Sequence, residues 1–287
     1  MKQNNNLTFL ISQVFRKSVF EDIVFKSNHS IWEKLLNDSE IRVELDGLNL
    51  SQAFDLLYRI IEKNYRNEYV FKNNIAHKLV KSRHKLSNVT YINEFHVLNS
   101  ICDIAIFNGT STAYEIKTEL DNFDRIESQL SDYRKIFEKI YIVTVESKIN
   151  FLQNRIPSEI GILELTSRNS LRIIREANSN FEELSYTAML SSLRYSEMLR
   201  MMKDLFDYEP SKSPKKIKQD CISLFESMSI IDAHHHFVKV LRQRSLNQQE
   251  KEFVRSLPYS LLALILNMRP SNNKMGKILY NLNNIII

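Results

Sequence analysis

The chain has 287 residues, a formal net charge of +5 and 43% hydrophobic residues, a composition typical of a globular protein with a sizeable core. It contains no Walker A loop, no dinucleotide-binding glycine motif and no paired CxxC, which argues against nucleotide-driven motors, dinucleotide enzymes and structural zinc. Cys102 and Cys221 match no metal or disulfide spacing, so we expect reduced, buried thiols in a cytoplasmic protein. We find no secretory signal and no run of 18 apolar residues, and we expect no membrane association.

The positive charge is concentrated in the last third of the chain. Residues 1–200 carry 26 basic and 26 acidic side chains, whereas residues 201–287 carry 13 and 8. A basic segment fits binding to a polyanion such as nucleic acid, and a solvated surface explains the same composition. The charge distribution alone therefore leaves both interpretations open.

Residues 1–66 are predicted to form a helical N-terminal extension. Apolar residues recur at helical spacing over 7–15 and again over 51–61, where Ser51 is the expected N-cap. Gly47 marks a break between helices. We find no residues in this segment that predict chemistry.

Residues 67–180 are predicted to form an α/β core with a mixed sheet. Asn108-Gly109 is a strong hairpin turn signal between two apolar strands. The segment 139–145 is β-branched and apolar throughout, which predicts a central strand buried on both faces. The expected helices are 69–83 and 122–137, and the expected strands are 89–98, 101–107, 112–118, 139–145, 160–166 and 171–174.

Residues 181–287 are predicted to form a helical, basic C-terminal region, with linker composition at 211–216. The apolar run 259–268 is too short to span a membrane and predicts a buried helix. The sequence Asp-Ala-His-His-His at 232–236 imitates a metal element of amidohydrolase barrels. Only 51 residues follow it, too few for a barrel, and they have the pattern of helices. The cluster could instead touch nucleic acid or simply lie on a helix.

Two neighbouring strands carry the residues that predict chemistry. Side chains alternate along a strand, so Glu115 and Lys117 share a face, and the hairpin turn brings Asp103 near Glu115. Two carboxylates can hold Mg²⁺, and a lysine beside them can orient or deprotonate a water and offset charge on a phosphate. The structural alternatives are a simple Glu115–Lys117 ion pair and a turn aspartate at 103. We favour the functional interpretation because a buried carboxylate is costly unless it is paired or metal-bound.

Other polar residues are placed to join this site. Arg125 and Gln129 are one helical turn apart at the edge of the apolar stripe, where they could reach the sheet. Glu94 in the preceding strand is a candidate third metal ligand or water-orienting base, and a solvent-facing carboxylate is an equal alternative. Glu68 and His96 are weaker candidates of the same kind.

The pattern of Asp103, an eleven-residue gap and Glu115-Ile116-Lys117 resembles the D…E-x-K element of the PD-(D/E)XK, or restriction-endonuclease-like, nuclease superfamily. The strand, turn, strand, helix and strand order agrees with the core of that superfamily. Gln129 and Tyr133 match its Q-x-x-x-Y helix signature. More narrowly, residues 67 to about 200 resemble a bacterial family of uncharacterised nuclease-like proteins.

The resemblance implies a restriction-endonuclease-like fold and a Mg²⁺- or Mn²⁺-dependent nuclease. Asp103 and Glu115, with Glu94, would hold the metal; the metal and Lys117 would activate water for in-line attack; Gln129 would position the lysine or the substrate. DNA is expected over RNA, with a role in defence against foreign DNA or in mobile-element biology. Cutting both strands would favour a homodimer. The alternatives are a non-cleaving module that binds nucleic acid or protein, and an effector subunit triggered by a partner protein.

Overall fold

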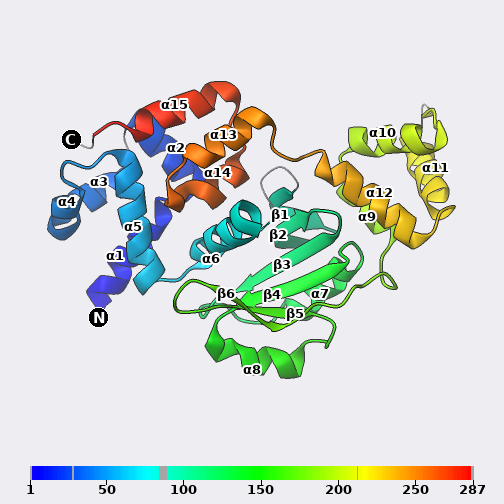
Figure 1. The fold of residues 1–287 in the computed structure, drawn as a ribbon, viewed down its shortest axis with the longest axis horizontal. Coiled ribbons are helices and arrows are strands. Elements are labelled where there is room, and N and C mark those ends of the chain that lie inside the picture. The colour runs from blue at the N-terminus through cyan, green and yellow to red at the C-terminus, as the bar shows by residue number, and fades with distance from the viewer. Residues whose placement is uncertain (1, 28, 84–88, 212, 286–287) are drawn as a thin grey trace. The chain divides into compact units, whose positions relative to one another are not determined.

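The computed structural model describes residues 2–27, 29–83, 89–211 and 213–285. The chain forms two compact units, one made of Met1–Arg83 with Leu246–Ile287 (unit 1) and one of His84–Ser245 (unit 2) (Figure 1). These units divide the chain differently from the three predicted segments. The last 42 residues group with the N-terminal helices, and the helices that follow the sheet stay with the sheet.

Unit 1 is helical in its described residues, as the apolar spacing predicts. Its N-terminal part contains α1 (Lys2–Gln13), α2 (Lys17–Lys26), α3 (Ser30–Leu36), α4 (Ser39–Leu45), α5 (Leu50–Asn64), α6 (Glu68–Ile75) and the π-helix η1 (Ala76–Arg83). Its C-terminal part contains α13 (Gln248–Ser256), the 3₁₀ helix η2 (Tyr259–Leu261), α14 (Leu262–Met268) and α15 (Asn272–Leu282). The expected helix at 69–83 therefore corresponds to α6 followed by η1.

The start of α5 differs from the expected N-cap at Ser51. Asn49 caps the helix instead, because its side chain accepts from the Gln52 backbone N–H at 2.9 Å while the Gln52 side chain accepts from Asn49 N–H. Gly47 lies between α4 and α5 with φ +71°, as a break between helices requires.

A buried asparagine explains why the C-terminal helices belong to unit 1. The Asn73 side chain donates to the Tyr259 carbonyl at 3.0 Å and accepts from the Ala263 backbone N–H at 3.0 Å. Asn73 has no exposed surface, so both bonds are needed to offset its burial. The apolar run 259–268 is buried in η2 and α14, which confirms the predicted buried helix.

Unit 2 is a mixed α/β fold built on a six-stranded sheet in the order β1-β2-β3-β4-β5-β6. The first two pairs are antiparallel, β3, β4 and β5 run parallel, and β6 is antiparallel to β5. The strands are β1 (Thr90–Val97), β2 (Ser100–Phe107), β3 (Ser111–Lys117), β4 (Lys139–Thr144), β5 (Gly161–Leu165) and β6 (Leu171–Arg175). The α/β class and the predicted strands are confirmed.

The Asn108-Gly109 turn folds β2 back on β3, as predicted. Gly109 has φ +119°, a conformation that favours glycine, and Ala105 pairs with Ala113 across the hairpin. All but the first residue of β4 are buried between β3 and β5, which confirms its central position.

Six helices among the described residues belong to unit 2. One links β3 to β4, one links β4 to β5 and was not predicted, and the others follow the sheet. They are α7 (Ile126–Arg134), α8 (Glu146–Arg155), α9 (Tyr186–Ser192), α10 (Tyr195–Phe206), α11 (Pro214–Glu226) and α12 (Ile230–Arg242). Each of these helices contributes buried residues to one hydrophobic core that also contains residues of the sheet.

The helix α7 is shorter than the predicted 122–137. Its start is delayed because the Asp121 carboxylate accepts from both the backbone N–H and the hydroxyl of Thr118, at 2.8 and 2.7 Å, and closes a turn after β3. The predicted apolar stripe is nevertheless buried, with Tyr133 and Phe137 fully enclosed. Across the described ranges, none of the helices combines the length and apolar character needed to cross a membrane.

Candidate active site

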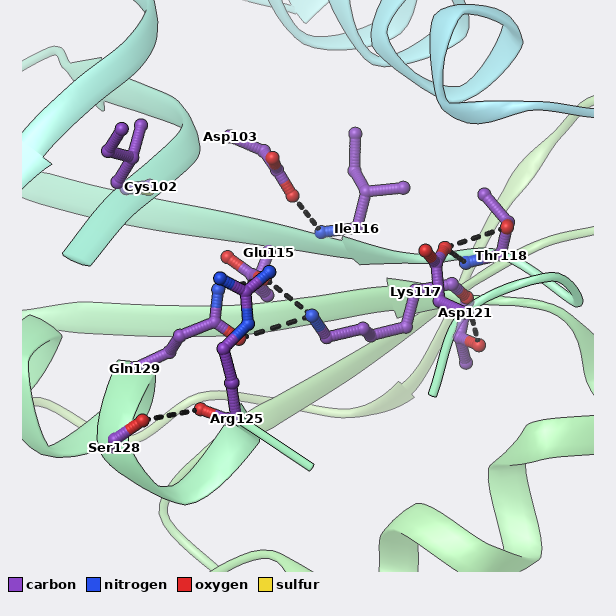
Figure 2. A network of polar contacts seen from close by, with 12 residues as sticks. Cys102, Asp103, Glu115, Ile116, Lys117, Thr118, Asp121, Arg125, Ser128 and Gln129 are labelled. Carbon is purple, nitrogen blue, oxygen red and sulfur yellow. Dashed lines mark hydrogen bonds and ion pairs between the residues drawn. The ribbon is translucent and has the colours of Figure 1, made fainter. Parts of the chain in front are cut away.

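The end of β3 carries a buried charged cluster, which we call the Glu115 cluster: Glu115, Lys117, Gln129 and Tyr133 (Figure 2 shows the first three). Glu115 Oε1 accepts from Lys117 Nζ at 2.8 Å and from Gln129 Nε2 at 2.8 Å. Its other oxygen, Oε2, accepts from the Tyr133 hydroxyl at 2.7 Å. The Glu115 side chain is only 3% exposed, so these three donors replace the water it loses on folding.

Lys117 is held from two sides. Its Nζ donates to Glu115 and, at 3.1 Å, to the Gln129 side-chain oxygen. Gln129 therefore bridges the acid and the lysine, donating to one and accepting from the other. The Lys117 side chain remains 12% exposed, so its ammonium is fixed in direction while the site keeps limited access to solvent.

The start of α7 adds a second cation. Arg125 is the N-cap residue of α7 and is exposed, and its carbonyl accepts from the Gln129 backbone N–H at 3.0 Å. In Figure 2 its side chain extends from the helix toward Glu115 and Gln129. The predicted placement at the edge of the buried face holds for Gln129, which is half-buried and contacts Glu115 and Lys117, whereas Arg125 precedes the helix and is exposed.

Asp103 lies where β2 and β3 part. The paired residues of the two strands end at Ile104 and Tyr114, so Asp103 and Glu115 are the next positions along the ladder. Asp103 Oδ2 accepts from the Ile116 backbone N–H at 2.7 Å, in place of a backbone carbonyl of β2 (Figure 2). Asp103 and Glu115 therefore occupy neighbouring positions on adjacent strands, and their carboxylates accept hydrogen bonds from different donors of the protein.

Glu94 occupies the matching position on β1. The register pairs Asn93 with Ile104 and Phe95 with Cys102, which places Glu94 opposite Asp103. Glu94 is exposed and has φ +53°, a left-handed conformation that is uncommon for a residue other than glycine. Three acidic residues thus follow one another across β1, β2 and β3. Within the ranges that the structure describes, however, no group of three or more His, Cys, Asp or Glu side chains is arranged to hold a metal ion.

Burial sets the protonation of the neutral groups beside the cluster. Burial raises the pKa of the Tyr133 hydroxyl above its usual value, and the nearby Cys102 and Glu115 raise it further. Burial likewise raises the pKa of the Cys102 thiol, with Glu115 and Asp103 adding to the effect. Tyr133 therefore stays protonated and acts as a hydrogen-bond donor to Glu115, and Cys102 stays a thiol.

Sequence reasoning placed Tyr133 in the apolar stripe and in the Q-x-x-x-Y signature but did not assign it a contact. Its spacing of one helical turn from Gln129, on the face that covers the sheet, was the available signal. The histidine run at 232–236 lies on helix α12, one of the two alternatives left by the sequence, and its buried member, His234, contacts Ser111 at 2.7 Å. Glu68 and His96 are not among the partners of the Glu115 cluster.

The fold and the cluster define a mixed α/β protein with a charged, almost enclosed site at the end of a sheet strand. The chain belongs to the family described as bacteriophage P4 protein cII, whose model matches residues 61–263, including the whole Glu115 cluster. Protein cII of Enterobacteria phage P4 is 27% identical over 203 residues, 67% of this chain and 75% of that protein. A protein of unknown function from Silicibacter pomeroyi is similar with a TM-score of 0.32 and 13% identity, over 49% of this chain and 92% of that one.

Proposed function

We propose that the protein is a cytoplasmic, divalent-metal-dependent nuclease that hydrolyses phosphodiester bonds, with DNA as its substrate. The observation that carries the proposal is the Glu115 cluster beside Asp103. It joins an acid, a lysine and a glutamine by direct hydrogen bonds, with a second carboxylate at the next position across the hairpin. The resemblance of these residues to the D…E-x-K and Q-x-x-x-Y patterns supports the same function.

The donor set fits Mg²⁺ or Mn²⁺. These ions prefer oxygen ligands, and Mg²⁺ is commonly bound by one or two carboxylates while it keeps several waters. Asp103 and Glu115 would supply the carboxylates, and Glu94, opposite Asp103, is the candidate for a further oxygen. When bound, the ion would lower the pKa of an attacking water and neutralise charge on the phosphate.

The chain's own residues would orient and stabilise the reacting groups. Lys117, fixed by Glu115 and Gln129, offers a directed positive charge to the attacking water or to the phosphate. Tyr133 fixes the remaining oxygen of Glu115 and so sets the plane of that carboxylate. Arg125, exposed at the start of α7, is placed to bind a phosphate oxygen from the solvent side.

One observation favours a second candidate, an effector subunit that acts only after a partner or ligand has bound. Both oxygens of Glu115 and one oxygen of Asp103 already accept hydrogen bonds from the protein. Metal binding would have to compete with these donors. A partner that shifted α7, and with it Gln129 and Tyr133, would release Glu115 for the metal.

The test is cleavage of supercoiled plasmid and of single-stranded DNA with Mg²⁺ or Mn²⁺, comparing wild type with Lys117→Ala and Asp103→Ala. We expect metal-dependent cleavage that falls at least ~100-fold in both variants, the loss typical of removing one electrostatic stabiliser. Lys26→Ala, in the exposed part of α2, is the matched control and should cut like wild type. Cleavage that persists in both site variants would rule out this site. DNA binding without cleavage by any form would favour the triggered effector or a non-cleaving binding module.

A further inference from the structure

Polar side chains continue from Lys117 across the rest of the sheet. The strand pairing places Lys117 beside Thr144, Thr144 beside Glu164, and Glu164 beside Arg172. Residues paired in this way on neighbouring strands point to the same face. The row therefore runs across β3, β4, β5 and β6 on the face that carries the Glu115 cluster. Two residues earlier in β4 and β5, the same face carries Ile142 and Ile162, which belong to the hydrophobic core.

Glu164 is a buried carboxylate that sequence reasoning missed. It is 3% exposed, and its Oε2 accepts from Arg172 Nε at 2.7 Å and from Arg172 Nη2. The Arg172 side chain, by contrast, is 58% exposed. The pair is thus asymmetric, with an anion enclosed by the protein and a cation directed outward. Burying an anion is costly, and ion pairs that only decorate a surface usually leave both partners exposed.

The position of the row is the second observation. The strands β3, β4 and β5 are parallel, so Lys117, Thr144 and Glu164 lie toward the carboxyl ends of three adjacent strands. Ligands of open α/β sheets bind outside these ends. At about 4.8 Å per strand, β6 lies about 14 Å from β3. That distance corresponds to roughly four nucleotides at 3.4 Å per step of a DNA strand.

We propose that Arg172 binds a backbone phosphate of the nucleic acid a few nucleotides from the bond placed at Lys117, and that Glu164 is the positioning residue that holds it. A guanidinium has two edges that present paired N–H donors. Glu164 takes the Nε and Nη2 edge, which leaves Nη1 and the outer N–H of Nη2 for a phosphate. This inference rests on the proposed function, and it extends the site from β3 to the edge strand β6.

The test measures binding of a fluorescent DNA duplex by anisotropy in EDTA, where metal-dependent cleavage does not interfere, at several salt concentrations. Arg172→Met should weaken binding about 10-fold near 0.1 M salt and lower the slope of log K against log salt by about 1, the effect of one lost phosphate contact. Arg168→Met is the matched control, because Arg168 is exposed in the turn between β5 and β6 and carries the same charge. It should leave the slope unchanged.

Further variants separate binding from folding. Arg172→Met leaves Glu164 buried without its cation, so the double variant Glu164→Gln/Arg172→Met, which removes both charges, should fold and still show the weaker binding. Arg172→Lys keeps the charge and loses the planar fork, and we expect an intermediate affinity. Glu164→Gln alone should weaken binding about 3-fold, with the salt slope retained because the arginine charge is still present.

Two outcomes overturn the inference, and they are distinguishable from each other. If wild type binds DNA and Arg172→Met loses no more than Arg168→Met, then Arg172 is not a phosphate contact, and the proposed nuclease function is untouched. If wild type binds neither duplex nor single-stranded DNA at low salt, then the proposed function fails together with the inference. A 10-fold loss confined to the Arg172 variants supports it.

Discussion

The two ends of strand β3 show two ways to bury ionisable side chains. At its start, Ser111 contacts His234 of α12 at 2.7 Å, and His234 is completely buried. At its end, the buried Glu115 forms a charged pair with the half-buried Lys117, and Gln129 and Tyr133 also contact this pair. One end of the strand thus encloses a neutral polar group, and the other encloses two charges.

The difference follows from the partners that each end provides. His234 has no anion in hydrogen-bond contact, and its Nδ1 has no hydrogen-bond partner among the residues that the structure describes. Burial lowers the pKa of His234 to about 4, although Glu138 opposes the shift and His235 adds to it. Glu115 instead receives three donors, one of them a cation. Buried charge is retained only where partners compensate it, and such partners are present at the Lys117 end of the strand.

The largest effect on stability is expected from removing the cation at the charged end. Lys117→Met should lower the free energy of unfolding by about 3 kcal/mol, because it leaves Glu115 buried without its counter-ion. Denaturant unfolding at pH 7.5 measures the change. The double variant Glu115→Gln/Lys117→Met removes both charges and should be more stable than the single variant. A single variant within about 0.5 kcal/mol of wild type would contradict the description of this end as a compensated charge pair.

A pH titration probes the neutral end. The folded-state pKa of His234 is depressed from 6.5 to about 4, so in that interval the unfolded chain binds more protons than the folded one. The stability that depends on keeping His234 neutral is therefore fully present above pH 6.5 and is lost as the pH falls toward 4. At pH 5 the loss is about 2 kcal/mol, from about 1.5 pH units at about 1.4 kcal/mol each.

The variant His234→Gln isolates this contribution. It should be less stable than wild type at pH 7.5, yet lose about 2 kcal/mol less between pH 7.5 and pH 5, as measured by urea unfolding at each pH. His235→Gln, at the exposed neighbouring position, should keep most of the wild-type pH dependence, because burial, the largest cause of the His234 shift, is retained. Identical pH dependence of wild type and His234→Gln would show that His234 is already protonated in the folded protein.

Tyr133→Phe should change stability less than the preceding variants. It removes a neutral hydrogen-bond donor from the charged end of β3 and so tests how much such a donor adds to the compensation of Glu115. The hydroxyl donates to Glu115 Oε2 at 2.7 Å and lies 2.8 Å from the Ile101 carbonyl. Its loss should lower the free energy of unfolding by about 1.5 kcal/mol, the usual value for a hydrogen bond to a charged group. Thermal unfolding measures this change. Under the proposed function, the same variant should also reduce cleavage by less than Lys117→Ala does.

The local features of the hairpin were predictable because they depend on short stretches of sequence. Asn108-Gly109 supplies the residue that the turn conformation needs, and alternation along a strand puts Glu115 and Lys117 on one face. The apolar, β-branched segment of β4 fixed its central position in the same way. The start of helix α7 was harder to predict. The Asp121 carboxylate closes a turn before the helix through a contact that residue type alone does not reveal.

The contacts of the candidate site were less predictable than its members. Asp103, Glu115, Lys117 and Gln129 were selected from sequence, but the sequence does not show that Asp103 accepts from the Ile116 N–H. Glu164 was missed because a glutamate in an apolar strand gives no local sign of the arginine opposite it on β6. These contacts depend on register between strands, which a single segment does not encode.

The sequence by itself determined the α/β class, the strands, the hairpin and the face shared by Glu115 and Lys117, because turn residues and apolar periodicity act over a few positions. Only the tertiary structure decided that the last 42 residues group with the N-terminal helices, and that Tyr133 and Gln129 enclose Glu115. It also decided that Glu164 extends the polar row to β6. Such outcomes depend on the burial of polar groups far apart in the chain, and a buried donor or acceptor is stable only where folding brings it a partner.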